Sequence, residues 1–282
     1  MTGPLVAFAT CRQVADLDED DRPLVPALRS RGVTVEPAVW DDPAVDWDRF
    51  DLVVLRSTWD YPSRAGEFLR WVEAVPRLAN PAPVVGWNVD KAYLGDLGPV
   101  PVVATTFVAP GAAAPEPLPS REVVVKPTVS AGARDTARLD DPAAVAALVA
   151  RIHRSGRTAM VQPYVGAVDT AGETAVVFVD GRFSHAARKG PLLAPGAGLV
   201  EALYAEESMS ARAATPDERA VADAALAAVP ADGPLLYARV DLVPGPDGPM
   251  VLEVEVTEPS LFLGLGDAVG TFADAIARRV AL

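Results

Sequence analysis

The chain has 282 residues, of which 50% are hydrophobic and 22% charged, so it is too apolar for a disordered protein and can bury the core of one or two domains. Its 38 acidic and 25 basic side chains give a formal net charge of −13, so it lacks the broad basic surface that nucleic acids and anionic membranes attract. One cysteine rules out an intramolecular disulfide, and two histidines argue against a histidine-built zinc site, so a metal would need carboxylate ligands.

The amino-terminal third of the chain alternates between strand and helix patterns. Apolar runs predict strands at residues 5–10, 33–40 and 51–55, the last one buried in a parallel sheet. A helix from about Asp21 is expected between the first two strands, and a second helix, capped by Ser63, after the third. This order predicts a βαβ-type unit. Because the apolar start has no cationic segment before it and no later run reaches the ~20 apolar residues of a membrane span, we expect a cytoplasmic protein.

The remaining two thirds contain short strands and well-marked helices. An apolar strand is predicted at residues 122–126, and a helix capped by Asp141 follows it. Asp-Gly at 180–181 predicts a tight hairpin, and Thr-Pro-Asp-Glu at 215–218 predicts a capping box at the start of another helix. Asp267 is expected to cap the last helix.

The most informative segment is an acidic hairpin near the carboxyl end of the chain. Because side chains alternate along a strand, Arg239 and Asp241 share one face of its first strand. Glu253 and Glu255 share one face of the second strand. An unbroken register from the turn sets Asp241 opposite Leu252. A one-residue bulge would instead set Asp241 opposite Glu253, and Arg239 opposite Glu255.

Three carboxylates this close among apolar residues would repel one another unless a cation neutralised them. Oxygen ligands without histidine or cysteine favour Mg²⁺ or Mn²⁺. The alternative is an ordinary strand pair whose acidic side chains face water, with Arg239 pairing them.

Two lysines are candidates for binding phosphate. Lys126 ends the apolar strand, where a cation is unfavourable unless it meets an anion, and the small residues at 128–134 could close their backbone N–H groups over phosphate oxygens. The same sequence is also typical of a strand that simply ends in a turn. Lys91 could equally be a ligand or a solvated helix lysine.

In combination, these segments resemble the ATP-grasp superfamily, which includes D-alanine–D-alanine ligase, glutathione synthetase and the RimK-type ligases. The matching segments occur in the family's order over residues 90–260, and they are Asp90-Lys91, Lys126-Pro127, Ser130-Ala131-Gly132, Gln162 to Val165, Gly172-Glu173, Arg239 to Asp241 and Glu253 to Ser260. One departure is Glu255, where the glutathione synthetase pattern has asparagine.

The resemblance implies a role for each matched residue. ATP would be bound by Lys91, Lys126, Ser130, Ala131, Gly132, Gln162, Tyr164, Val165 and Glu173, with the lysines on the phosphates, residues 162–165 around the adenine and Glu173 on the ribose. The metal ligands would be Asp241, Glu253 and Glu255. Arg239 would face the reacting acyl group, and we expect Arg239 and Lys126 to be the catalytic residues.

A further set of motifs looks like the cycloserine synthetase branch of that superfamily, whose enzyme is an O-ureido-serine cyclo-ligase. The set includes residues 56–62, the pairs 80–81 and 87–88, and residues 183–186. By this resemblance, the substrate would meet Arg56, Ser57, Thr58, Trp59, Tyr61, Lys189 and Glu258. The alternative for the 56–61 segment is a loop anchored by its aromatic residues.

We therefore expect a mixed α/β (α+β) ATP-grasp fold. Residues 1–86 would form the substrate domain, 87–166 the lid, and 167–282 the subdomain that binds metal and ATP. The expected enzyme is an ADP-forming ligase that uses ATP and Mg²⁺ (or Mn²⁺) to activate a small amino-acid-like carboxylate and join it to nitrogen, in one molecule or between two. A nucleotide-binding regulatory protein without catalysis is the rival from another class. Neither nucleic acid nor membrane is an expected partner, and a homo-oligomer is left open.

Overall fold

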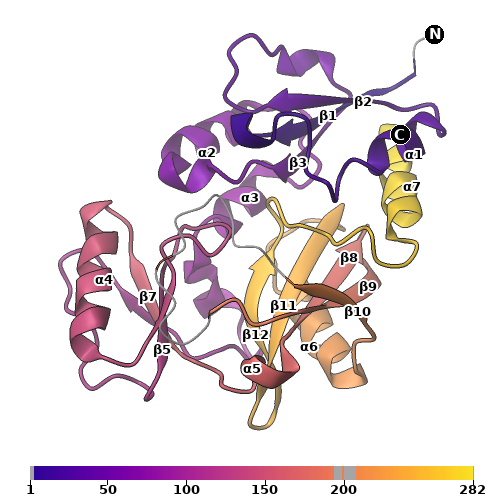
Figure 1. The fold of residues 1–282 in the computed structure, drawn as a ribbon. Coiled ribbons are helices and arrows are strands. Elements are labelled where there is room, and N and C mark those ends of the chain that lie inside the picture. The colour runs from indigo at the N-terminus through magenta and orange to yellow at the C-terminus, as the bar shows by residue number, and fades with distance from the viewer. Residues whose placement is uncertain (1–2, 194–198, 200–207, 282) are drawn as a thin grey trace.

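The computed structural model describes residues 3–193, 199 and 208–281, which form three sheets and their covering helices (Figure 1). The first sheet is parallel, with the strand order β2-β1-β3. Its elements are β1 (Leu5–Thr10), α1 (Leu24–Arg29), β2 (Thr34–Val39), β3 (Leu52–Ser57), α2 (Ala65–Ala74) and α3 (Ala82–Asn88). Strand β1 is buried on both faces, because Val6 packs in one hydrophobic cluster and Ala7 in another. The predicted βαβ-type unit is confirmed.

Two predicted helix starts in this unit are wrong. Helix α1 begins at Leu24, later than the expected start at about Asp21, whose side chain is buried in an ion pair with Arg56. Ser63 belongs to a short 3-10 turn, and its hydroxyl donates to the Asp60 carbonyl at 2.9 Å. Arg64 therefore precedes α2, and its side chain makes no capping hydrogen bond.

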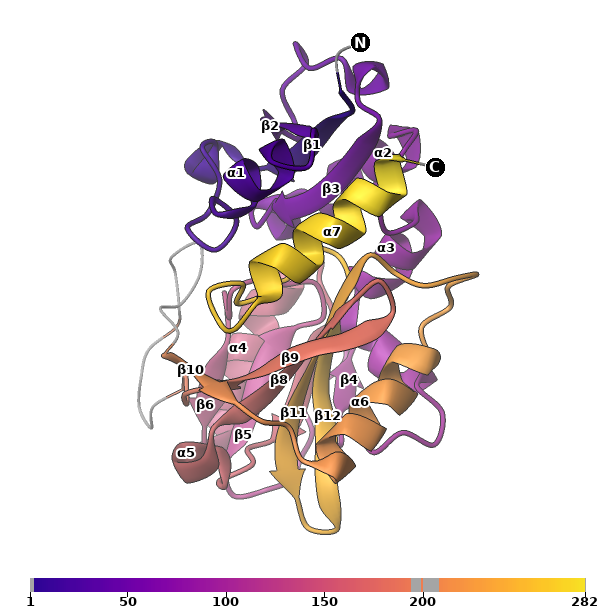
Figure 2. The ribbon, with the colours of Figure 1, turned by 90° about the vertical axis from the view of Figure 1, so that its right-hand side faces the viewer.

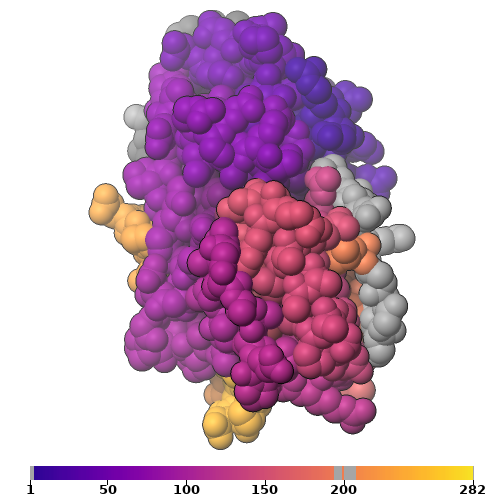
Figure 3. Space-filling view, turned by 90° about the vertical axis from the view of Figure 1, so that its left-hand side faces the viewer, coloured from indigo at the N-terminus to yellow at the C-terminus, as the bar shows by residue number. Residues whose placement is uncertain are grey.

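The second sheet is antiparallel, with the order β4-β7-β5-β6. It contains β4 (Thr106–Val108), β5 (Val123–Pro127), β6 (Ala137–Leu139), α4 (Pro142–Arg154) and β7 (Ala159–Pro163). Asp141 caps α4 as predicted, by accepting from the backbone N–H groups of Ala143 and Ala144. Helix α4 covers the face of β5 that carries Val123 and Val125, which leaves Lys126 on the opposite face. On the side shown in Figure 3, this second sheet and α4 lie below the amino-terminal unit.

The third sheet is antiparallel, with the order β10-β9-β8-β11-β12. Its elements are α5 (Val168–Ala171), β8 (Glu173–Val179), β9 (Arg182–Lys189), β10 (Met209–Arg212), α6 (Pro216–Ala227), β11 (Tyr237–Gly245) and β12 (Gly248–Glu255). The predicted hairpin turn between β8 and β9 is confirmed, with positive φ angles of 52° at Asp180 and 71° at Gly181. The capping box of α6 is confirmed as well. Helix α6 covers one face of this sheet, so the charged face of β11 and β12 points the other way.

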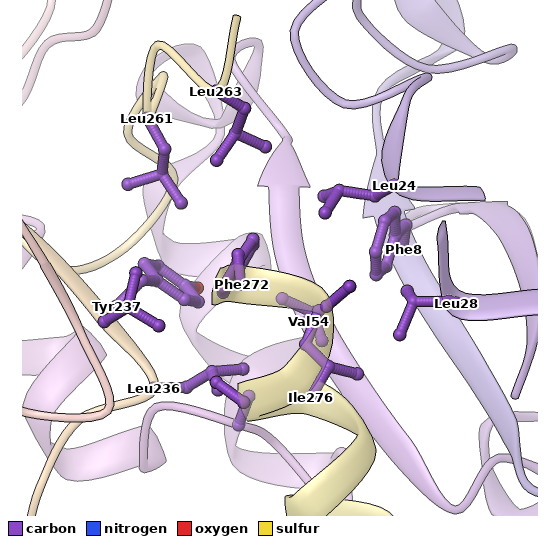
Figure 4. Packing of buried hydrophobic residues seen from close by; sticks show 14 of the residues in the cluster. Phe8, Leu24, Leu28, Val54, Leu236, Tyr237, Leu261, Leu263, Phe272 and Ile276 are labelled. Carbon is purple, nitrogen blue, oxygen red and sulfur yellow. The ribbon is translucent and has the colours of Figure 1, made fainter. Parts of the chain in front are cut away.

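The last helix, α7 (Ala268–Val280), returns from the third sheet to the first (Figure 2). Its Phe272 and Ile276 pack between Tyr237 of β11 and the apolar residues of β1 and α1 (Figure 4). Asp267 lies at the predicted start of the helix, but its side chain makes no capping hydrogen bond. Among the described residues, no helix is both long and apolar enough to cross a bilayer.

Candidate active site

A cavity of about 710 Å³ lies where the three sheets meet. Its walls come from the free face of β5 and β7, the charged face of β11 and β12, and the amino-terminal unit through Trp59 and Tyr61. The loop at 130–133 and the segment 258–265 complete it. The cavity therefore collects residues that are far apart in the chain.

The acidic hairpin adopts the bulged register. Asp241 pairs with Glu253 and Arg239 with Glu255, and the register shifts directly after Asp241. Leu252 is the extra residue, and its side chain lines the cavity. The bulge is the reason that the charged residues of both strands face the same side.

Asp241 is held by two cations from different strands. Its carboxylate accepts from Arg239 Nε at 2.8 Å and from Lys189 Nζ at 2.8 Å. Lys189 also lies 3.3 Å from a Glu173 carboxylate oxygen. Burial alone would raise the pKa of Asp241, but the charges of Arg239 and Lys189 outweigh it and lower the pKa below its ordinary value.

Lys91 is buried and ties the loop to the hairpin, so it is not a solvated helix lysine. Its ammonium lies 2.9 Å from a Glu253 carboxylate oxygen and donates to the Ser130 carbonyl at 2.7 Å. Lys126 is also buried, at 8% exposure, but none of the hydrogen bonds and ion pairs found in the described part of the chain involves its ammonium. Burial lowers the pKa of Lys126. A buried cation that lines a cavity without an ion pair is well placed to meet an anionic ligand.

The remaining carboxylates of this wall are crowded. Glu255 lies 2.7 Å from Arg239, yet burial and the neighbouring Glu253 and Asp241 carboxylates raise its pKa to about 7. Burial and the nearby Glu255 raise the pKa of Glu258 to about 8. Such crowding favours a bound cation.

A divalent cation fits the donor chemistry of this wall. Among the described residues, no three acidic, histidine or cysteine side chains are grouped closely enough to hold a metal by themselves. Mg²⁺ is commonly bound through one or two carboxylates together with substrate phosphates, so Glu253 and Glu255 beside a nucleotide would suffice.

Beside β7, the cavity wall forms an apolar slot. Val165, Val168 and Leu252 are among its apolar residues. The Gln162 amide donates to the Thr105 hydroxyl at 2.9 Å, and its own carbonyl oxygen is buried without a partner. Tyr164 lies at the edge, where Arg138 stacks 3.6 Å from its ring centre. A flat heterocycle with a hydrogen-bond donor matches this slot.

The loop between β5 and β6 is shaped by its backbone. Ser130, Ala131 and Gly132 line the cavity as the small-residue pattern suggests. Positive φ angles occur at Gly132 (60°), Ala133 (60°) and Asp135 (56°). Arg157 anchors the loop by donating to the Asp135 carboxylate at 2.6 Å.

The 56–61 segment divides into two parts. Trp59 and Tyr61 line the cavity, and the Trp59 indole N–H donates to the Glu258 carbonyl at 3.1 Å. Arg56, Ser57 and Thr58 are fully buried and are not among the cavity residues, which corrects the expectation that they meet substrate. The physical reason is the ion pair of 2.8 Å between Arg56 and Asp21, which turns Arg56 into the core.

Sequence reasoning missed the side chains that support β12. Tyr93 and Asn88 bind the backbone of Val254 and Val256, which lie beside Glu253 and Glu255. The Trp-Asn pair at 87–88, noted in the sequence, was the one signal that could have pointed to Asn88. A second omission is the acidic loop: Asp18, Glu19 and Asp20 line the cavity, and the Asp20 carboxylate accepts from the N–H groups of Leu261 and Leu263.

Comparison with known proteins adds family information. Residues 6–80 match the model of the amino-terminal domain of D-cycloserine synthetase DcsG. The chain is 44% identical to the cycloserine biosynthesis protein DcsG of Streptomyces lavendulae, over 98% of this chain and 99% of that protein. A crystal structure of D-cycloserine synthetase DcsG superposes with a TM-score of 0.90 at 42% identity, covering 98% of this chain and 99% of the other.

More distant structures share the fold. D-alanine–D-alanine ligase from Bacillus anthracis complexed with ATP has a TM-score of 0.70 at 14% identity, over 100% of this chain and 98% of that one. The ATP-grasp ligase PsnB complexed with minimal precursor, Mg and ADP has a TM-score of 0.60 at 19% identity, over 98% of each chain. The fold is therefore the ATP-grasp fold.

Proposed function

The chain belongs to the DcsG family of ATP-grasp ligases, and from this we propose that it converts the carboxylate of a small amino-acid-like molecule into an acyl phosphate and closes it onto a nitrogen of the same molecule. The observation that carries the proposal is a cavity that joins three features. They are the apolar slot, the Lys126 ammonium, for which the described part of the chain holds no ion pair, and Arg239 with the neighbouring Asp241 and Glu255 carboxylates. The substrate class we propose is O-ureido-serine.

We propose that ATP lies along the cavity, with its adenine in the slot beside Gln162 and Val165 and its ribose near Glu173. Lys126 and the small-residue loop would hold the phosphates, and Lys91 would position Ser130 and Glu253 for the same task. Mg²⁺ would be held by Glu253 and Glu255, with Asp241 as a third carboxylate on that face, and its chemistry is to neutralise phosphate charge. The division at 1–86, 87–166 and 167–282 into substrate, lid and metal-binding segments belongs to this proposal.

The reaction needs no protein nucleophile. The substrate carboxylate oxygen attacks the γ-phosphorus and ADP leaves, which depends on positioning and charge neutralisation. The nitrogen then attacks the acyl carbon and passes its proton to the departing phosphate, which also takes the bonding electrons of the broken C–O bond. Arg239 would stabilise the negative oxygen that forms on the acyl carbon. Trp59 and Tyr61 would enclose the rest of the molecule. Holding both reacting groups in one molecule supplies orientation that two separate substrates would lack.

The experiment combines purified protein, ATP, Mg²⁺ and O-ureido-serine, with and without an added amine, and measures ADP, phosphate and product mass. The proposal predicts ADP release with one organic substrate and no stimulation by the amine. Strict dependence on a second amine would reject ring closure and favour a two-substrate ligase. ATP binding without ADP release from any amino acid tested would favour the regulatory protein.

A further inference from the structure

Glu258 differs in its partners from the other carboxylates that β8, β11 and β12 bring to the cavity. Asp241 and Glu173 lie near Lys189, and Glu255 near Arg239. Glu253 is paired with Lys91. Within the described parts of the chain, Glu258 takes part in no ion pair, and the side chain in hydrogen-bonding reach of its carboxyl group is the neutral Tyr61 hydroxyl. Of these five carboxylates in the described chain, Glu258 is the one that forms no ion pair, although the charge of Lys91 partly offsets its own.

The position of Glu258 is fixed by its surroundings. Trp59 donates to its backbone carbonyl, so the amino-terminal unit holds this residue against the wall. Arg239 donates to the Ser260 carbonyl at 2.8 Å, which keeps the segment that follows β12 beside the proposed reaction centre. Because Trp59 and Tyr61 line the same region, a ligand group that reaches Glu258 would be enclosed by aromatic side chains. Aromatic walls tolerate an organic cation better than an anion.

The charges around Glu258 determine which ligand group could bind there. Burial and the Glu255 carboxylate raise the pKa of Glu258, and the Lys91 charge opposes them only in part, so the protein alone compensates ionised Glu258 incompletely. A ligand cation would supply that compensation, whereas a second carboxylate would add repulsion. An ammonium group has three donors and suits one carboxylate next to a hydroxyl.

We propose that Glu258, supported by Tyr61, binds the non-reacting ammonium group of the amino-acid substrate while Arg239 faces its carboxylate. This inference rests on the proposed function and assigns the part of the substrate that takes no part in bond formation. Glu258 then acts as the residue that selects α-amino acids over the corresponding plain carboxylic acids.

The test is a binding cycle that does not depend on turnover. Calorimetry with a non-hydrolysable ATP analogue and Mg²⁺ compares O-ureido-serine with the same molecule carrying hydrogen in place of its ammonium group, on the wild type and Glu258→Gln. We expect the variant to lose about 10- to 100-fold in affinity for the amino acid and to change little for the deamino compound. Glu73→Gln, an exposed substitution on α2, is the matched control and should behave as the wild type.

Several results would overturn the assignment. Equal losses for both ligands would mean that Glu258 only shapes the wall. If the variant binds both ligands like the wild type but turns over more slowly, Glu258 acts as a proton acceptor instead. If neither binding nor turnover changes, the ammonium group binds elsewhere, near Asp18 or Glu19. Tyr61→Phe serves as a second variant, because it keeps the carboxylate and should retain the preference for the amino acid. Absence of ADP formation by the wild type would count against the proposed function, while the binding comparison would still decide this assignment.

Discussion

Lys189 reaches Asp241 at 2.8 Å although their strands, β9 and β11, are separated by β8. Asp241 is only 2% exposed, and Arg239 takes its other oxygen. Its carboxylate is therefore shared by two buried cations and also lines the cavity. This double role makes Asp241 part of the stability of the sheet.

Asp241→Asn should abolish ADP formation and also lower the free energy of unfolding by about 3–5 kcal/mol, because it removes the buried carboxylate that Arg239 and Lys189 share. Urea unfolding measures the second effect. The double variant Asp241→Asn with Lys189→Gln should regain part of the stability but none of the activity. Glu253→Gln should lose activity at a smaller cost in stability, because Glu253 is more exposed to the cavity. Full activity in either single variant would contradict the proposed metal site.

Lys126→Ala should weaken nucleotide binding by about 1.5–3 kcal/mol, the range for a lost hydrogen bond to a charged group. Because burial lowers the pKa of Lys126, its ammonium is present at low pH and is lost as pH rises through that lowered value. The nucleotide affinity of the wild type should therefore begin to fall at a lower pH than it would if the pKa of Lys126 were that of an ordinary lysine. Lys126→Arg should remove this pH dependence. Calorimetry at several pH values measures both effects. If neither substitution changes the nucleotide affinity, Lys126 does not bind phosphate and only ends the strand.

Arg56→Met should destabilise the fold by about 3–5 kcal/mol, since it leaves the buried Asp21 carboxylate unpaired. The nucleotide affinity of the folded fraction should be unchanged, because Arg56 lies outside the cavity. Thermal unfolding and calorimetry with ATP separate the two effects. A stable variant with a large loss of substrate affinity would restore Arg56 as a substrate residue.

Trp59→Ala should reduce turnover with the organic substrate while sparing ATP binding. The indole lines the substrate end of the cavity and holds the Glu258 backbone, and the proposed ATP position is on the lid side. The contrast to measure is KM for the organic substrate against Kd for ATP. Comparable losses in both would mean that Trp59 organises the whole cavity.

Glu258→Gln should make the unliganded protein more stable at pH 8 and above. Burial raises the pKa of Glu258 from 4.5 to about 8, so the folded chain keeps a proton that the unfolded chain releases, and the wild type loses stability as pH rises between these values. Glutamine cannot ionise and avoids this loss. The advantage should be ~1–3 kcal/mol near pH 8 and disappear below pH 4. Urea midpoints across that range measure it, and a constant difference at every pH would contradict this cause.

The sequence predicts elements where a local pattern decides them. The capping box of α6 is an example, because its four residues contain all of its partners. The register of the acidic hairpin is only partly decided in this way, since strand alternation and the turn leave two registers and the structure adopts the bulged one. The direction of Arg56 is different. A cation at the end of an apolar strand reads as a ligand, and only the distant Asp21 turns it into the core. The sequence leaves Lys91 open between a ligand and a solvated lysine, because its partner Glu253 on β12 is 162 positions later in the chain.

The outer side of β12 has a consequence for the behaviour of the molecule in concentrated solution. This strand ends its sheet, and Asn80, Asn88 and Tyr93 occupy the backbone groups of Val254 and Val256 on that side. The backbone of Val251 is bonded to Pro101 and Val103. An edge strand whose backbone is covered in this way offers no row of unpaired N–H and C=O groups to another chain. The side chains that steady Glu253 and Glu255 therefore also guard the sheet against edge-to-edge aggregation.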